Sequence, residues 1–158
     1  MKITFTLNGK RVTAEKEPGR LLLEYLRAEE LHSVKYGCGH GECGSCAVLI
    51  NDKAYNACLI LMHTLGGKRV ETLESFGGHQ SLTALQEVFL DEGAIQCGYC
   101  TPGMLVSLEA LSRGSKPLTE DSIREALAGN LCRCTGYVKP VVAARKLKSA
   151  NQGEHYIP

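Results

Sequence analysis

The stretch that decides the fold of the first half runs from Gly37 to Cys46 and reads GCGHGECGSC. It holds three cysteines, and glycine stands at four of its ten positions. Glycine adopts backbone conformations that other residues avoid, and it lets the chain approach a bulky group closely. The stretch therefore predicts a loop that wraps around a group held by thiolates, with backbone N–H groups directed at sulfur.

Three cysteines of this loop, Cys38, Cys43 and Cys46, have the spacing Cys-x4-Cys-x2-Cys, and Cys58 follows from a separate segment. This is the spacing of plant-type ferredoxins, in which four thiolates hold one [2Fe–2S] cluster. The sequence thus predicts a first cluster on a set that we call the first quartet: Cys38, Cys43, Cys46 and Cys58.

The other four of the eight cysteines, the second quartet, form two close pairs: Cys97 with Cys100, and Cys132 with Cys134. Thr101-Pro102 follows the first pair and is typical of a helix start. We expect another helix to begin at Thr135-Gly136, just after the second pair. Both pairs would then lie at helix N-termini, whose partial positive charge favours thiolates and a reduced cluster. We therefore expect a second cluster that is easier to reduce than the first.

Three other uses of the cysteines compete with two clusters. Disulfides are disfavoured because Cys132 and Cys134 are too close for an easy bridge and the N-terminus shows no signal-peptide pattern. Two four-cysteine zinc sites are disfavoured because the four-residue and one-residue gaps do not match paired Cys-x2-Cys knuckles. A mixture in which some cysteines are ordinary buried thiols is the third alternative.

The composition of the 158 residues excludes several classes of partner. The formal net charge of +1 provides no basic field for nucleic acid or an anionic membrane, and Trp is absent. No stretch approaches the ~20 apolar residues of a membrane helix. We expect a cytoplasmic protein with no nucleic-acid or membrane partner. In a reducing compartment, many cysteines indicate metal or redox chemistry.

The hydrophobic pattern of the first half indicates strands and one helix. Apolar residues alternate over residues 3–7, and Asn8-Gly9 is a hairpin signal. Helical spacing follows over residues 21–30, with a second hairpin around Asn51-Asp52 and a last strand over residues 69–72.

From Ser81 onward the pattern is helical. Ser81 is the expected N-cap of a helix that carries Leu85 and Phe89. Three further helices are expected over residues 101–113, from 117–119 to 128, and from about 137 to 150, with Pro140 in the first turn of the last. We expect domains over residues 1–75 and 76–158, a linker over residues 74–80 and a polar tail over residues 151–158.

Three long motifs together resemble the iron–sulfur subunit of the molybdenum hydroxylases, the family of xanthine dehydrogenase, aldehyde oxidoreductase and carbon monoxide dehydrogenase. They are the stretch from Gly37 to Cys46, QCGYCTPG over residues 96–103 and GNLCRCTGY over residues 129–137. The resemblance covers about residues 2 to 148. It implies a β-grasp ferredoxin-like domain followed by a four-helix bundle, an α+β chain with two [2Fe–2S] clusters.

The resemblance also implies partners and roles. The second quartet would face molybdopterin in a large subunit, with Gln96 and Cys134 contacting the pterin, and the first quartet would face FAD in a medium subunit. The chain would be the electron-transfer subunit of a dimer of heterotrimers and carry no catalytic residue. The alternative is a freestanding two-cluster redox adaptor. The substrate stays undetermined because its pocket would lie in another chain.

Three polar residues near the cysteines are given lesser roles. Rieske-type sites place two histidines on one iron, and four cysteines leave no vacancy, so we expect His40 to be a solvent-facing loop residue. Glu42 is expected to be a surface or subunit-facing charge. Arg133 either screens cluster charge, pairs across a subunit interface or is solvated.

Overall fold

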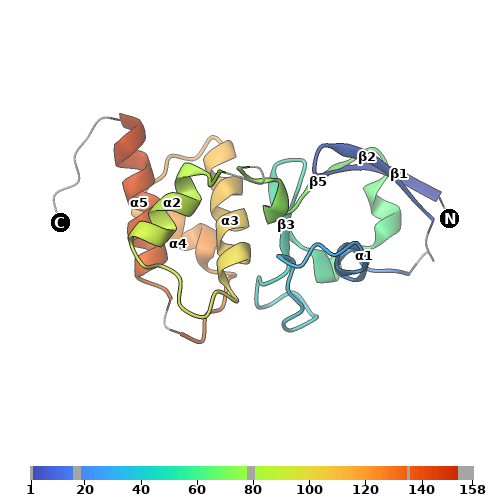
Figure 1. The fold of residues 1–158 in the computed structure, drawn as a ribbon, viewed down its shortest axis with the longest axis horizontal. Helices are drawn as coiled ribbons and strands as arrows, with labels where there is room; N and C mark the ends of the chain where they lie inside the picture. Colours follow the sequence, from blue (N-terminus) through green and yellow to red (C-terminus); the bar gives the residue numbers. More distant parts are fainter. Residues whose placement is uncertain (1, 16–18, 78–80, 135, 153–158) are drawn as a thin grey trace.

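The computed structural model describes residues 2–15, 19–77, 81–134 and 136–152. A sheet with its helix lies at the N-terminal end of the long axis, and the remaining helices lie at the C-terminal end (Figure 1). The expected mixture of a strand-containing first half and a helical second half is confirmed. Parts of the expected linker (78–80) and tail (153–158), and Thr135, lie outside the described residues.

The first half contains five strands, one α-helix and three short 3-10 helices. The strands are β1 (Lys2–Leu7), β2 (Lys10–Glu15), β3 (Ala47–Ile50), β4 (Lys53–Asn56) and β5 (Arg69–Glu71). The helices are α1 (Leu22–Ala28), η1 (Ala57–Leu59), η2 (Met62–Leu65) and η3 (Leu73–Ser75). The second half contains α2 (Ala84–Asp91), α3 (Thr101–Arg113), α4 (Glu120–Leu127) and α5 (Lys139–Gln152).

The five strands form one mixed sheet in the order β2-β1-β5-β3-β4. β1 and β5 are parallel, and the other neighbours are antiparallel. Both hairpins turn where the sequence predicts them, and Asn8, Gly9, Asn51 and Asp52 all have positive φ angles. Two successive left-handed residues match the twist of a tight hairpin, which is why such turns favour asparagine, aspartate and glycine.

β3 is buried on both of its faces, and this joins the two halves of the protein. Val48 and Ile50 pack into the core between the sheet and α1. Ala47 and Leu49 point the other way and pack with Phe76 and with Val106 of α3. Because side chains alternate across a strand, four consecutive apolar residues serve two cores. We call the apolar cluster of Ala47, Leu49, Phe76 and Val106 the seam.

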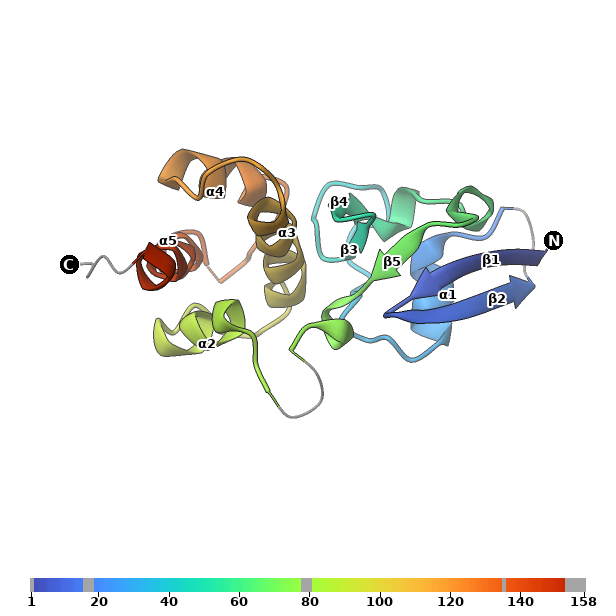
Figure 2. The ribbon, with the colours of Figure 1, turned by 90° about the horizontal axis from the view of Figure 1, so that it is seen from above.

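α3 lies between the sheet and the other helices (Figure 2). Its Val106 faces the seam, whereas Met104, Leu105 and Leu108 belong to the helical core. The other helices contribute a set of buried apolar side chains to that core: Leu85, Phe89, Ile123, Leu127, Val141, Ala143 and Ala144. α3 is therefore the helix through which the second half is attached to the sheet.

Two of the expected helix starts are wrong by a few residues. α2 is capped by Thr83 and not by Ser81: Thr83 and Gln86 form a reciprocal capping box, which satisfies two backbone N–H groups that a serine earlier in the chain would leave free. α5 begins at Lys139 instead of Tyr137. Pro140 lies in the first turn of α5, as expected, where proline is tolerated.

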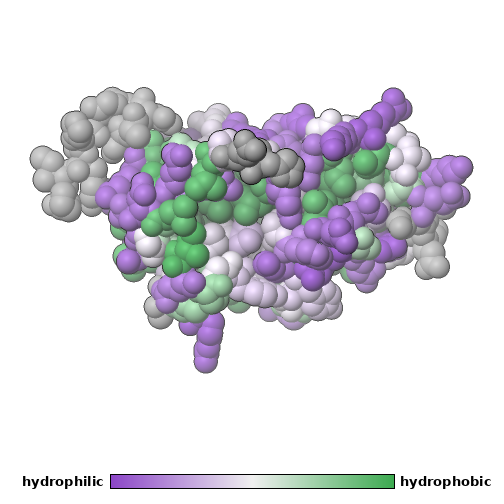
Figure 3. Space-filling view, viewed as in Figure 1, coloured by the Kyte–Doolittle hydropathy of each residue, from purple (hydrophilic) through white to green (hydrophobic). Residues whose placement is uncertain are grey.

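Some apolar surface remains exposed on the helical half. Leu82 and Leu90 are 50% and 54% exposed, and Figure 3 shows apolar surface in the region of α2. Among the described residues, none of the helices combines the length and the apolar character needed to cross a membrane.

Candidate functional site

The first quartet is assembled by one loop and one hairpin. Cys46 immediately precedes β3, and Cys58 lies in η1, immediately after β4. The hairpin pairs Ala47 with Asn56, and the N–H of Ala57 donates to the carbonyl of Cys46 at 3.1 Å. The antiparallel return of the chain therefore brings Cys58 back to Cys46, and the two buried thiols interact directly.

Backbone N–H groups of the glycine-rich loop point at its sulfurs. The Sγ of Cys38 accepts from the N–H groups of His40 at 3.5 Å and Glu42 at 3.3 Å, and the Sγ of Cys43 accepts from the N–H of Cys38 at 3.4 Å. Backbone N–H groups, first that of His40, then those of Cys43 and Glu42, lower the pKa of Cys38 to about 6. The expected backbone N–H groups directed at sulfur are therefore present in this loop.

The second quartet is assembled from the segments at the start of α3 and before α5. Cys97 interacts with Cys134, and Cys100 interacts with Cys132. The Sγ of Cys132 accepts from the N–H of Gly136 at 3.2 Å. A hollow of about 440 Å³ is lined by three of these cysteines and four neighbours: Cys97, Cys100, Cys132, Tyr99, Leu131, Arg133 and Tyr137.

The thiols of each quartet interact most directly in twos, and weaker interactions join these pairs: Cys43 with Cys46, Cys97 with Cys100 and Cys132 with Cys134. The interacting pairs are Cys38 with Cys43, Cys46 with Cys58, Cys97 with Cys134 and Cys100 with Cys132. A tetrahedral zinc site needs four ligands around one ion. A binuclear cluster presents its ligand positions on two irons, which suits two pairs.

Each quartet has one inner and one outer pair. Burial raises the pKa of Cys46 and of Cys100 to about 12 in each case. At the outer pairs, N–H donation lowers the pKa of Cys38 and, chiefly through Tyr99, that of Cys97. Metal binding requires thiolates, so a metal centre bound at Cys46 or Cys100 would have to displace the proton that burial favours.

Of the two helix N-termini expected at the second quartet, the structure has the one after Cys97 and Cys100 but not the one after Cys132 and Cys134. Cys100 is the N-cap of α3, as expected. Cys134 is not adjacent to a helix, because α5 begins only at Lys139, and the expectation is wrong there. The N–H groups near that pair come from the turn before α5, where the N–H of Cys132 donates to the hydroxyl of Tyr137 at 2.7 Å.

The residues that the family resemblance placed at the pterin are neighbours. The side-chain amide of Gln96 donates to the carbonyl of Cys134 at 2.6 Å, and Gln96 is exposed. In the first loop, His40 and Glu42 are exposed, with side-chain fractions of 64% and 75%, and they pair with each other at 3.1 Å. A mutual pair on the surface agrees with the minor roles expected for them.

The two cysteine loops touch each other, which the sequence did not reveal. The N–H of Leu131 donates to the carbonyl of Cys43 at 3.0 Å, and the buried amide of Asn130 donates to the carbonyl of Gly44 at 3.3 Å. Gly103 approaches the same carbonyl so closely that a Cβ there would lie 2.2 Å from its oxygen. Asn130 belongs to the motif over residues 129–137, but no local signal in the sequence indicated that it contacts the other cysteine loop.

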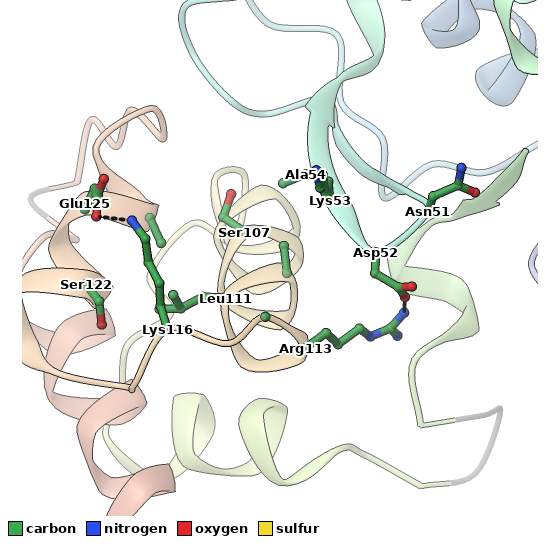
Figure 4. Close-up of a pocket in the computed structure, with 13 residues that line it drawn as sticks. Asn51, Asp52, Lys53, Ala54, Ser107, Leu111, Arg113, Lys116, Ser122 and Glu125 are labelled. Carbon is green, nitrogen blue, oxygen red and sulfur yellow. Dashed lines mark hydrogen bonds and ion pairs between the residues drawn. The ribbon is translucent and has the colours of Figure 1, made fainter.

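A second groove, of about 500 Å³, lies at the other end of α3 and contains none of the cysteines. Arg113 reaches from α3 across it to Asp52 in the β3–β4 turn, at 2.9 Å, and Lys116 pairs with Glu125 on its other wall (Figure 4). Arg113 also pairs with Glu71 of β5 at 2.9 Å. The groove is thus spanned by ion pairs that attach α3 to the sheet.

Comparison with protein families first shows the class of domains that this chain contains. Residues 5–72 match the family described as "2Fe-2S iron-sulfur cluster binding domain", and residues 72–145 match the family described as "[2Fe-2S] binding domain". The chain therefore carries two domains of [2Fe–2S]-binding type, one around each quartet.

Individual relatives narrow this class. The chain is 43% identical to the xanthine dehydrogenase iron-sulfur-binding subunit of Escherichia coli O157:H7, covering 92% of this chain and 95% of the relative. It is 42% identical to the nicotinate dehydrogenase small FeS subunit of Eubacterium barkeri, covering 90% and 92%. A chain of quinoline 2-oxidoreductase from Pseudomonas putida 86 superimposes with a TM-score of 0.86 at 38% identity, covering 98% of each chain. The chain belongs to the family of iron–sulfur subunits of the xanthine dehydrogenase type.

Proposed function

We propose that this chain is the electron-transfer subunit of a multi-subunit molybdenum hydroxylase, carrying electrons between molybdopterin in a large subunit and FAD in a medium subunit. The observation that carries the proposal is that the fold gathers the eight cysteines into two quartets, in loops that contact each other and in regions that match [2Fe–2S]-binding families. When bound, [2Fe–2S] clusters supply one-electron chemistry that no side chain here can provide.

The chain's own residues hold and tune these groups. The first quartet, Cys38, Cys43, Cys46 and Cys58, would hold one cluster, and the second, Cys97, Cys100, Cys132 and Cys134, the other. N–H donors at Cys38 and Cys43 stabilise negative charge on sulfur, as does the N–H of Gly136 at Cys132. Gln96 and Cys134 lie together and would contact the pterin of the large subunit where that subunit faces the second quartet.

Exposed apolar side chains beside the second quartet support a protein partner there. Tyr99 and Tyr137 are each 46% exposed, Leu131 is 56% and Val138 is 64% exposed. Aromatic and apolar residues of this kind are enriched at the centres of interfaces. The large subunit is the partner that the family assignment suggests for this surface.

The remaining details of the proposal concern organisation. We assign residues 1–75 to a β-grasp ferredoxin-like domain and residues 76–158 to a domain whose helices α2 to α5 form a four-helix bundle. The matched ranges, which meet at residue 72, support this division. The proposed assembly is a dimer of heterotrimers in the cytoplasm.

Co-purification tests the proposal. Expressed with its neighbouring genes and isolated through a tag on this chain, the protein should bring down a molybdopterin-containing large subunit and an FAD-containing medium subunit. The complex should show two distinct [2Fe–2S] EPR signals on reduction. Isolation of a cluster-containing chain with neither partner would favour the freestanding redox adaptor instead, and a colourless zinc protein would exclude both.

A further inference from the structure

One buried side chain, that of Asn130, links the loop of the first quartet to the second half. Asn130 is only 3% exposed, and both ends of its amide are used. Its Nδ2 donates to the carbonyl of Gly44 at 3.3 Å, and its Oδ1 accepts from the hydroxyl of Ser107 on α3 at 2.9 Å. One amide therefore connects a first-quartet loop to the helix that begins at the second quartet.

The contact lies directly between cysteines of the two quartets. Gly44 follows Cys43, and Asn130 comes shortly before Cys132. The N–H of Leu131 donates to the carbonyl of Cys43, so two successive carbonyls of the loop are bound by two successive residues of the other half.

The backbones pack closely around this contact. A Cβ at Gly103 would lie 2.2 Å from the carbonyl oxygen of Gly44, and a Cβ at Gly44 would lie 2.4 Å from the carbonyl oxygen of Gly129. Gly44 also has a φ of +68°, a conformation that favours glycine. The backbones of the two loops can approach this closely only because both positions lack side chains.

We propose that Asn130 is a positioning residue that fixes the separation and orientation of the two cluster sites. The inference rests on the proposed function, because it assumes that both quartets carry clusters. Asparagine suits the position because it offers a donor for the Gly44 carbonyl and an acceptor for the Ser107 hydroxyl. Aspartate offers no donor, and alanine offers neither.

Removing Asn130 should shift the loop without separating the halves. Other contacts across the molecule remain: the hydroxyl of Tyr99 donates to the carbonyl of Tyr36 at 2.6 Å, and Arg113 pairs with Asp52 and Glu71. The apolar seam is also untouched. The variant therefore changes the relation between the sites more than it changes either site.

The experiment measures the magnetic interaction between the two clusters in the fully reduced holoenzyme by low-temperature EPR. This interaction depends steeply on distance and orientation, which overall stability does not report. We expect Asn130→Ala and Asn130→Asp to keep both signals while the splitting between them changes or is lost. Electron equilibration between the sites after rapid partial reduction should also slow.

Asn56→Ala is the matched control. Asn56 likewise donates an amide N–H to a carbonyl of the first loop, that of Gly41 at 2.7 Å, but from within the first half. This variant should alter the first signal and leave the splitting unchanged. The same change of splitting in Asn56→Ala as in the Asn130 variants would overturn the inference, because general loosening of the loop would explain both.

Two further outcomes are decisive. Unchanged splitting in Asn130→Ala with both clusters present overturns the inference. If Asn130→Ala loses a cluster, Ser107→Ala replaces it, since that change removes only the hydroxyl that orients the amide; unchanged splitting in Ser107→Ala then overturns the inference. Wild-type protein without [2Fe–2S] signals would instead mean that the proposed function has failed.

Discussion

The two cysteine quartets differ in how the chain completes them. In the first quartet, three cysteines lie in one loop and a single hairpin, β3–β4, returns the fourth. In the second quartet, α3 and α4 lie in the sequence between Cys97 and Cys100 on one side and Cys132 and Cys134 on the other. The first site therefore depends on the turn and strand pairing of one hairpin, whereas the second depends on the packing of helices in a separate core.

The quartets nevertheless share one electrostatic design. Each has an inner thiol, Cys46 or Cys100, whose pKa is raised by burial, and an outer thiol, Cys38 or Cys97, whose pKa is lowered by backbone N–H donors. Similar chemistry has been reached by different local structures. The sites differ in how far apart in the sequence the cysteines lie that each of them brings together.

The largest expected effect is loss of a single cluster. Cys46→Ser and Cys100→Ser each replace an inner thiolate by a poorer ligand, so each variant should lose its own cluster. The iron content should then fall by about half, since each quartet holds one binuclear centre. Iron analysis and EPR of both variants measure this. If either variant lost both signals, the two sites would not be independent.

The dependence of the second quartet on helix packing predicts the next effect. Phe89 of α2 is fully buried in the helical core. Phe89→Ala should lower the free energy of unfolding by ~3–5 kcal/mol through lost burial and a cavity, and should deplete the second cluster while the first persists. Denaturant unfolding and EPR of the same samples report both quantities.

The matched control is Phe5→Ala, since Phe5 is 2% exposed in the other core. This change should cost a similar free energy but leave the second cluster in place. Depletion of both clusters to the same extent in the two variants would argue against separate cores.

A smaller effect on stability should show that Thr83, and not the Ser81 that the sequence suggested, caps α2. Thr83→Ala removes the capping box of α2 and should destabilise the second half by about 1 kcal/mol. Ser81→Ala should change stability by less than ~0.5 kcal/mol, because the Ser81 hydroxyl binds the carbonyl of Gly77 and caps no helix. Thermal unfolding of the two variants decides between the caps, and equal effects would contradict the structure.

An effect of similar size, which should vanish in acid, concerns the segment that leaves the sheet toward the helices. Burial raises the pKa of Glu74, but hydrogen bonds from Ser33 and Thr72 outweigh this and hold it below its ordinary value of 4.5. A depressed carboxyl pKa adds stability above the unfolded-state pKa and loses it as the pH falls through the folded-state value. Glu74→Gln should therefore be less stable than wild type at pH 7, by about 1 kcal/mol from weakened hydrogen bonds.

That difference should disappear in acid, below the folded-state pKa of Glu74, where the protonated wild-type side chain resembles glutamine. Denaturant unfolding between pH 7 and pH 3 follows it. A difference between Glu74→Gln and wild type that did not change with pH would assign the effect to packing instead of charge.

Much of the site could be predicted because its signals are local. The cysteine spacing, the glycines between the cysteines and the Asn8-Gly9 and Asn51-Asp52 turns depend on neighbours in the sequence, and the structure has the turns in those places. The start of α3 at Thr101-Pro102 was likewise predictable, because proline is favoured in the first turn of a helix.

Only the tertiary structure decided which distant residues meet. The sheet order, the pairing of Cys97 with Cys134, the cap at Thr83 and the contacts of Asn130 and Gly103 with Gly44 all result from packing. A sequence pattern records which side chains are apolar or able to bind metal. Which of them share a core or a seam depends on contacts between remote segments, whose energies no local window contains.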